Sequence, residues 1–303
     1  MSPRVFGNLA GVLSMLVWAT GLPAAAEILK SWHPLLVMPS RMAFAGVVLL
    51  IIVAAWEGLP RLNIRLSKDI MLAGGAMGLS GQMLVWGQAY ADPVNVAIIV
   101  ASMPAISAVV GTVTGRERLS LALVAGVVLA IAGGVISMMG EDRPAAIAAI
   151  GLGELLVFAS TVLFVLFTRI SVDRLATLSD LSRAAVTAAA SAVVTAPIAV
   201  IAGLSGLVDL AYSFDPKTLA LLAWLGCIAI GLSSVFWMAA CRLLGVTVAA
   251  MHNNLIPFYT MVFALLLGQT VSPMQAVGGV LVICGAALAQ IQFRSLRFRP
   301  RGK

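Results

Sequence analysis

The sequence predicts an all-α, polytopic membrane protein with ten transmembrane helices arranged as two inverted five-helix repeats. Hydrophobic residues make up 61% of the 303-residue chain and charged residues only 10%, whereas about a quarter of the residues in a soluble domain are charged. A soluble protein of this composition would lack the polar side chains needed to cover its surface. Long apolar stretches and an internal duplication are the other two observations behind the prediction.

Ten apolar stretches each approach the roughly 20 residues that cross a bilayer as a helix. They run over 5–26, 34–56, 69–90, 93–114, 119–139, 147–168, 180–203, 217–241, 245–267 and 273–292. The joins are short, and three of them place an N-cap side chain directly before a proline at the first helical position, as in Asp92-Pro93, Asp215-Pro216 and Ser272-Pro273. These joins leave no room for a soluble domain.

The chain also repeats itself, because residues 93–137 return at 245–289 with an offset of 152. The matched positions are Pro104 with Pro257 (one residue out of register), Glu117 with Gln269, Leu119 with Val271, Ser120 with Ser272, Gly126 with Gly278, and Gly133 with Gly285. The first and sixth stretches agree at an offset of 146, which relates Gly7, Leu9 and Trp18 to Gly153, Leu155 and Phe164. Both copies are apolar, so the duplicated unit is a membrane unit and not a soluble repeat.

The number of spans in each copy predicts how the copies are related. Five spans force the second copy to enter the membrane from the opposite side, which gives a pseudo-twofold axis in the membrane plane. Inverted repeats of this kind produce two similar shapes, one open to each side, and favour a carrier with a shared site near the midplane. We expect the first five-helix repeat at 1–143, the second at 144–293, and a basic cytoplasmic tail at 294–303.

The N-terminal stretch admits a second interpretation. Arg4, the apolar run after it and Ala24-Ala25-Ala26 resemble a secretory signal peptide with a small-residue cleavage site. Because the sixth stretch repeats features of the first, we expect the first stretch to be retained as part of the first repeat.

The basic residues predict the orientation in the membrane. With the N terminus inside, all of the 19 lysines and arginines fall on the cytoplasmic side except Lys30, Arg41, Arg143 and Lys217. This asymmetry predicts that both termini are cytoplasmic. The bases are dispersed over loops, so a nucleic-acid partner is not expected, and the tail from Arg294 is expected near anionic lipid headgroups.

The sequence offers little support for an enzyme. It contains no glycine-rich phosphate loop, zinc-ligand spacing or nucleophile elbow, and its histidines, His33 and His252, are far apart. The cysteines are odd in number and scattered, which predicts packing roles: Cys227, Cys241 and Cys284. We therefore expect no catalytic residues, cofactor or metal.

Several short motifs point to one family. In the first half they are Gly7-x-Leu9, Trp18-Ala19-Thr20, Pro104, the turn Gly115-Arg116-Glu117-Arg118-Leu119-Ser120, and Gly126 with Gly133. In the second half they are Pro257, Gly268-Gln269, Ser272, Gly278 and Gly285. With these motifs, nearly the whole chain resembles the drug/metabolite transporter (DMT) superfamily, specifically its ten-helix EamA-type branch, and it is similar to YddG-type aromatic amino acid exporters. The chain departs from the family pattern in two ways: Arg116 stands between Gly115 and Glu117, and in the second copy Gln269 replaces the glutamate. Both departures argue against a proton site shared by these two turns.

The resemblance implies a secondary transporter of the bacterial cytoplasmic (inner) membrane that works by alternating access through a central cavity. We expect export of small amphipathic metabolites, amino acids including aromatic ones first among them. The alternatives are export of drugs or other metabolites of the same superfamily, or a channel-like facilitator. One internal duplication supplies one pathway per chain, so we expect a monomer whose partners are the lipid bilayer and a small-molecule substrate.

The third stretch offers a candidate binding face. Gly78, Gln82, Trp86 and Tyr90 recur at a spacing of four and share one face of a helix. A glutamine amide that faces lipid lacks hydrogen-bond partners, so this face is expected to turn inward. The alternative is helix-to-helix packing, with Gln82 bonded to a neighbouring helix.

Further candidates lie in other stretches. His252-Asn253-Asn254 in the ninth stretch point in three directions, and Pro257 frees a backbone carbonyl near Asn253. Deep aromatic residues could line the same cavity or simply fill the core: Trp18, Phe164, Trp237 and Tyr259. In the fourth stretch Asn95 and Ser102 are expected to line the cavity at two depths.

Charges and helix breakers complete the set of predictions. Glu154 and Arg41 lie in the first turns of their spans toward the outer face, where they could pair. Glu154 or His252 could titrate in a proton-coupled mechanism, although passive export fits the sequence equally well. Hinges are expected where helices lose a regular hydrogen bond, near Gly21, Pro23, Pro104 and Pro257.

Overall fold

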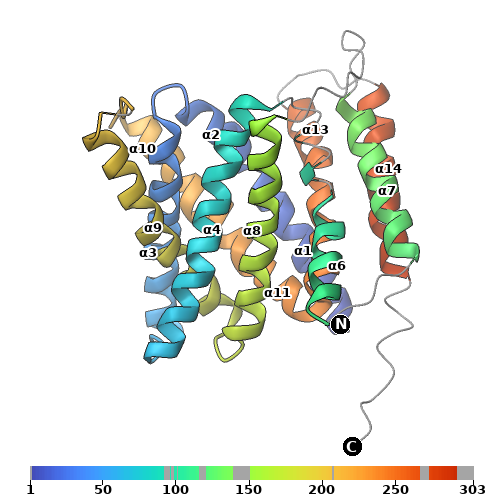
Figure 1. Cartoon of the computed structure of the whole chain (residues 1–303), viewed down its shortest axis with the longest axis horizontal. Coiled ribbons are helices and arrows are strands. Elements are labelled where there is room, and N and C mark those ends of the chain that lie inside the picture. The colour runs from blue at the N-terminus through green and yellow to red at the C-terminus, as the bar shows by residue number, and fades with distance from the viewer. Residues whose placement is uncertain are drawn as a thin grey trace, which may run out of the picture.

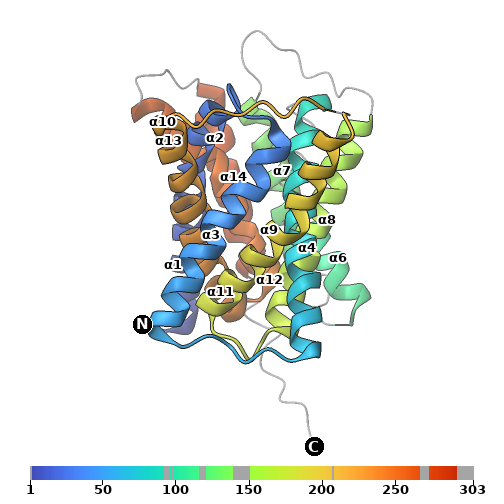
Figure 2. The same cartoon turned by 90° about the vertical axis from the view of Figure 1, so that its left-hand side faces the viewer.

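The computed structural model of the chain describes residues 2–91, 96, 99–100, 102–115, 121–138, 151–206, 208–266 and 273–291. Within these ranges all regular secondary structure is helical, as the sequence predicts. The helices stand side by side with their axes roughly along one direction, so the molecule is a bundle (Figures 1 and 2).

The elements follow the predicted spans closely. In chain order they are α1 (Pro3–Ala19), α2 (Gly21–Ile28), α3 (Pro34–Trp56), α4 (Ile64–Tyr90), α6 (Met103–Val113), α7 (Leu121–Met138), α8 (Leu152–Arg174), α9 (Asp180–Leu204), α10 (Pro216–Ala223), the π-helix η1 (Trp224–Leu232), α11 (Ser233–Leu244), α12 (Val246–Ala250), the 3₁₀-helix η2 (Met251–Leu255), α13 (Ile256–Leu266) and α14 (Pro273–Ile291).

Six helical runs in the described part of the chain are long and apolar enough to cross a membrane. They are Pro3–Ile28, Pro34–Trp56, Ile64–Gln88, Leu152–Arg174, Asp180–Leu204 and Pro216–Leu244, with Met103–Val113 as a shorter apolar helix. These runs coincide with the predicted first, second, third, sixth, seventh and eighth spans. The other four predicted spans include positions outside the described residues.

One predicted helix start is visible in full. Asp215 lies before Pro216 and its Oδ1 accepts a hydrogen bond from the Thr218 N–H at 2.9 Å, which satisfies a free donor in the first turn of α10. Asp92-Pro93 and Ser272 lie outside the described residues, and α14 begins at Pro273.

Two of the predicted spans are broken where the sequence places helix breakers. The first divides at Thr20 into α1 and α2, with Gly21 and Pro23 in the first turn of α2. The ninth divides into α12, η2 and α13, so that the polar triplet from His252 lies in the 3₁₀ segment and Pro257 is near the start of α13. Pro104 lies in the first turn of α6. Whether these joints act as hinges stays a prediction.

The eighth span contains a feature that its sequence did not predict. Its middle third, η1, is a π-helix, a conformation that is rare and frequent at functional sites. Gly226 lets η1 approach α3 closely, because a Cβ at this position would meet Phe44 and would lie 2.7 Å from the carbonyl oxygen of Arg41. The backbone of α3 around Arg41 is therefore held against η1.

Helices from the two halves of the chain alternate in the bundle. The main packing partners are α3 with α9, α7 with α14, α4 with α8, and α1 with α11. In Figure 1 the pair α7–α14 lies at one end of the bundle and the pair α3–α9 at the other. The remaining pairs lie between them and enclose the centre of the molecule.

Candidate functional site

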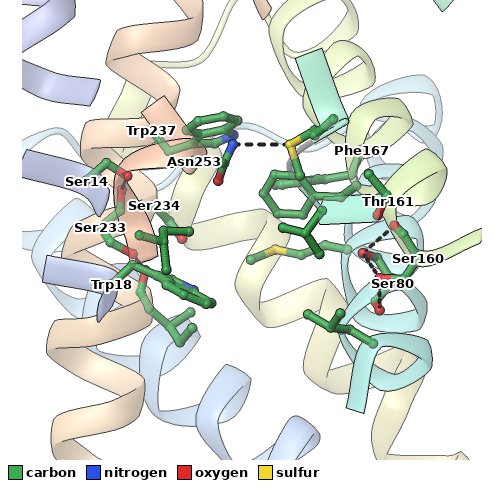
Figure 3. Close-up of a pocket in the computed structure, with 18 of the residues that line it drawn as sticks. Ser14, Trp18, Ser80, Ser160, Thr161, Phe167, Ser233, Ser234, Trp237 and Asn253 are labelled. Carbon is green, nitrogen blue, oxygen red and sulfur yellow. Dashed lines mark hydrogen bonds between the residues drawn. The ribbon is translucent and has the colours of Figure 1, made fainter. Parts of the chain in front are cut away.

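A cavity of about 150 Å³ lies at the centre of the bundle (Figure 3). It is bounded by side chains from α1, α3, α4, α8, η1, α11 and the region around η2 and α6. The lining residues are Ser14, Met15, Trp18, Met38, Arg41, Met42, Met77, Ser80, Gly81, Leu84, Val100, Met103, Ser160, Thr161, Phe164, Phe167, Ile230, Ser233, Ser234, Trp237, Asn253 and Ile256. The wall thus combines apolar surface with hydroxyls, one amide and one guanidinium.

Aromatic rings form one part of the wall. The ring centroids of Phe164 and Trp237 are 5.7 Å apart with an interplanar angle of 47°, and Phe164 is 5.5 Å from Phe167. The indole nitrogen of Trp237 donates to Thr168 Oγ1 at 3.2 Å, which fixes the orientation of the ring. Trp18 on α1 belongs to the opposite wall from Phe167 in Figure 3. Such rings can stack on an aromatic side chain or face a cation.

Paired serines join helices at the edges of the cavity. Ser80 on α4 and Ser160 on α8 each donate a hydrogen bond to the other's carbonyl oxygen at 2.8 Å. Ser14 on α1 donates to the carbonyl oxygen of Ser233 on α11, also at 2.8 Å. All these hydroxyls use their proton on the backbone, so toward the cavity they can offer acceptor lone pairs only.

Asn253 supplies the amide of the wall. Its Nδ2 donates to Ala250 O and to Met103 Sδ, both at 3.1 Å (Figure 3). The amide nitrogen is therefore engaged within the protein, which leaves the Oδ1 atom as the group able to accept a hydrogen bond from a ligand.

Arg41 is the cation of the wall. Its Nη2 and Nε point at the sulfur of Met38, at 2.8 and 3.1 Å. It makes no ion pair with any residue that the structure describes. The pairing with Glu154 expected from the sequence is therefore absent.

The candidate face of the third span turns elsewhere. The residues of α4 that reach the cavity are Met77, Ser80, Gly81 and Leu84, at helical spacing. Trp86 and Tyr90 belong to another face of the helix and are 38% and 75% exposed. Gln82 is buried outside the cavity wall, and its Nε2 has no hydrogen-bond partner among the described residues. The structure thus does not gather this stripe at the cavity, and its binding role stays a prediction.

The neighbours of Asn253 are also buried away from the wall. His252 packs its ring against α1 at Gly11, where a Cβ would lie 2.7 Å from the ring, and its Nδ1 is 3.2 Å from Ala249 O. Asn254 is buried, and its Oδ1 lacks a partner in the described part of the chain. Tyr259 is half-buried, and its hydroxyl donates to Val12 O at 3.5 Å, so it ties α13 to α1.

Three further predicted residues occupy different situations. Ser102 precedes α6 and donates to Ile99 O at 2.7 Å, while Val100 and Met103 on either side of it line the cavity. Asn95 lies outside the described residues. Glu154 is buried at the start of α8, where its Oε2 accepts from Gly151 N at 2.9 Å and caps its own helix.

The sequence analysis missed the hydroxyls and methionines of the wall. One signal was available, because Ser14 and Ser160 are related by the same offset of 146 that relates Trp18 to Phe164. The methionines gave no signal, since a methionine in an apolar helix is equally common in any core.

The comparisons with known proteins agree with this architecture. The profile of the EamA-like transporter family matches the chain twice, over residues 5–139 and 151–290. A curated relative from Bacillus subtilis (strain 168), described as an uncharacterized transporter named YyaM, is 23% identical over 272 residues, which cover 86% of each chain. A solved crystal structure, described only as that of a protein, superposes with a TM-score of 0.76 at 19% identity over 96% of this chain and 100% of the other, and shares its fold. Because the two profile matches span most of the sequence, the chain belongs to the EamA-like transporter family.

Proposed function

We propose that this transporter is a secondary carrier of a bacterial cytoplasmic membrane that exports small amphipathic metabolites, amino acids including aromatic ones first among them. It works by alternating access, with the central cavity open to one side of the membrane at a time. The cavity is the observation on which the proposal rests. Its rings, hydroxyls and amide provide polar and aromatic groups around one space at the centre of the bundle.

An inverted repeat of 1–143 on 144–293 is part of the proposal, and two observations support it. The family profile matches once in each half. An inverted repeat would exchange the first span with the sixth and the third with the eighth. Under that exchange, the bond from Ser14 in the first span to Ser233 in the eighth corresponds to the bond from Ser160 in the sixth span to Ser80 in the third. The second span would likewise exchange with the seventh, and the fifth with the tenth. These spans already pack on each other, as the pairs α3–α9 and α7–α14.

The size and chemistry of the cavity support a small metabolite as substrate. A volume of about 150 Å³ is below the roughly 300–1,000 Å³ of sites for drug-sized ligands. Phe164, Trp237 and Trp18 offer ring faces to an aromatic side chain or an ammonium group. The Oδ1 of Asn253 and the serine oxygens offer acceptors to the same ammonium group.

The distribution of basic residues supports cytoplasmic termini. The start of α1 and the joins 57–63 and 175–179 lie at the same end of the bundle, because successive spans are antiparallel. Basic side chains gather at this end, including Arg4, Arg61, Arg65, Arg174 and Arg242. An excess of lysine and arginine on one side marks the cytoplasmic face.

Uptake of radiolabelled amino acids into liposomes that contain the purified protein tests the proposal, with and without an imposed pH gradient. Saturable uptake that unlabelled amino acids compete is the expected result. Trp18→Ala and Asn253→Ala should raise KM, whereas Leu204→Ala, at a side chain that is 85% exposed, should not. Flux that rises linearly with concentration would indicate a channel-like facilitator, and absence of any uptake would remove amino acids as substrates.

A further inference from the structure

Arg41 is the one charged side chain among the described residues that line the cavity. It lies two turns into α3, beside Pro39, and its backbone is held against η1 at Gly226. The rest of the wall is neutral: methionine, aromatic, serine, threonine and asparagine side chains. The cavity therefore has a net positive charge.

The guanidinium group is only partly used by the protein. Of its five N–H donors, those on Nε and Nη2 that face Met38 contact a sulfur atom, which is a weak acceptor. Gly81 on α4 leaves room beside the group, because a Cβ at that position would lie 3.1 Å from Nη2 and closer still to Met38. The edge of the guanidinium group that carries Nη1 has no acceptor among the described residues.

A structural role does not explain this arrangement. Arg242, in contrast, binds a strong acceptor, since it donates to both carboxylate oxygens of Asp180 at 2.7 to 3.1 Å. An ionised group inside a membrane protein is costly and is retained where it pairs or acts on a substrate. Arg41 has no anionic partner among the described residues, so a ligand anion is the partner that would offset the cost.

We infer that Arg41 binds the carboxylate of the transported substrate. This inference rests on the proposed function, because it names the group by which the same cavity recognises its substrate. The free edge of the guanidinium group matches the two oxygens of a carboxylate in a bidentate arrangement. A single cation balances a single negative charge, so a monocarboxylate fits better than a phosphate monoester with nearly two charges.

The inference also ranks the parts of an amino acid by importance. No carboxylate of the protein lines the described wall, so an ammonium group meets only neutral acceptors such as Asn253 Oδ1. Loss of the carboxylate should therefore abolish binding, whereas loss of the amino group should be tolerated.

Binding to the detergent-solubilised full chain tests this inference, in a buffer free of chloride and phosphate. The probes are phenylalanine, 3-phenylpropionate, phenylalaninamide and 2-phenylethylamine, and the readouts are calorimetric affinity and thermal stabilisation. The wild type should bind the two carboxylates and neither of the other probes. Arg41→Met should weaken carboxylate binding on the order of 10- to 100-fold, and Arg41→Lys should restore part of it. The matched control is Arg65→Met, at an exposed arginine.

Stability separates the binding role from a structural one. Because Arg41→Met breaks no ion pair within the described part of the chain, the melting temperature of this variant without ligand should equal or exceed that of the wild type. Binding of the amide as tight as that of the acid, binding of neither carboxylate by the wild type, or unchanged affinity in Arg41→Met would each overturn the inference. Saturable uptake that is insensitive to Arg41→Met would overturn it too, while the proposed carrier function would stand. Arg41-dependent binding without liposome uptake would support carboxylate recognition by Arg41 and would remove amino acids as transported substrates.

Discussion

Ser80 and Ser160 donate hydrogen bonds to each other's carbonyl oxygens, at 2.8 Å in both directions, and so join α4 to α8 at the cavity. Both side chains are buried, and their small size lets the two helices approach closely. A second serine bond at the cavity, from Ser14 on α1 to the carbonyl oxygen of Ser233 on α11, joins another pair of helices from the two halves of the chain. In the inverted repeat that we propose, these two joints occupy equivalent positions.

The reciprocal serine bond should contribute measurably to stability. We expect Ser80→Ala and Ser160→Ala each to cost about 0.5–1.5 kcal/mol of unfolding free energy. The double variant should cost less than the sum, because the 3.3 Å contact between the two Oγ atoms is already lost in either single variant. Reversible unfolding in mixed micelles measures these values. The control is Ser205→Ala, at an exposed hydroxyl that donates to a carbonyl of its own helix end. Strictly additive costs of Ser80→Ala and Ser160→Ala would contradict direct contact between the two serines.

Close approach of η2 to α1 should make Gly11 sensitive to substitution. An added Cβ would lie 2.7 Å from the ring of His252, which is held by its own helix and by Gly11. We expect Gly11→Ala to cost about 1–3 kcal/mol and to slow transport. Gly75→Ala is the matched control, because its Cβ would meet Val194 at an ordinary 3.7 Å. Equal melting temperatures for the two variants would contradict the packing.

The orientation of Trp237 should matter for transport. Trp237→Phe keeps the ring contact with Phe164 but loses the hydrogen bond to Thr168. We expect KM for aromatic amino acids to rise a few-fold with little change in melting temperature. Thr168→Val removes the acceptor of the same hydrogen bond and should raise KM by a similar factor. A normal KM in both variants would show that the ring does not contact the substrate.

The position of Glu154 predicts that this residue does not couple transport to protons. Its carboxylate caps α8 by accepting from Gly151 N and does not line the cavity. We therefore expect Glu154→Gln, which keeps an acceptor oxygen for the cap, to leave the response of liposome uptake to a pH gradient unchanged. Disappearance of that response in this variant alone would assign proton coupling to Glu154. The same assay on His252→Gln tests the second candidate.

The helices could be predicted from sequence because hydropathy and helix capping are local properties. The runs Pro34–Trp56 and Asp180–Leu204 coincide with the predicted spans 34–56 and 180–203 to within one residue, and Asp215 caps α10 as its place before a proline predicts. Three of the deep aromatic residues, Trp18, Phe164 and Trp237, also line the cavity. Phe164 lies near the middle of Leu152–Arg174, where an inward side chain is close to the bundle axis.

The remaining site could not be predicted because it depends on which neighbour each helix face meets. The stripe of Gln82, Trp86 and Tyr90 has helical spacing, yet α4 turns its serine and glycine face to the cavity because Ser80 packs on α8. Spacing identifies a face but not its partner. Likewise, the similar depth of Arg41 and Glu154 allowed the two side chains to pair, whereas Arg41 lines the cavity and Glu154 caps its own helix.

Accessibility of Ser234 tests the central claim, that one cavity opens alternately to the two sides. Ser234→Cys would be placed in a chain whose own cysteines, Cys227, Cys241 and Cys284, are replaced by alanine or serine. Oriented vesicles are then treated with a membrane-impermeant maleimide from either side. The account predicts labelling from both sides and slower labelling when saturating substrate is present. Labelling from one side only, or labelling that substrate does not change, would contradict it.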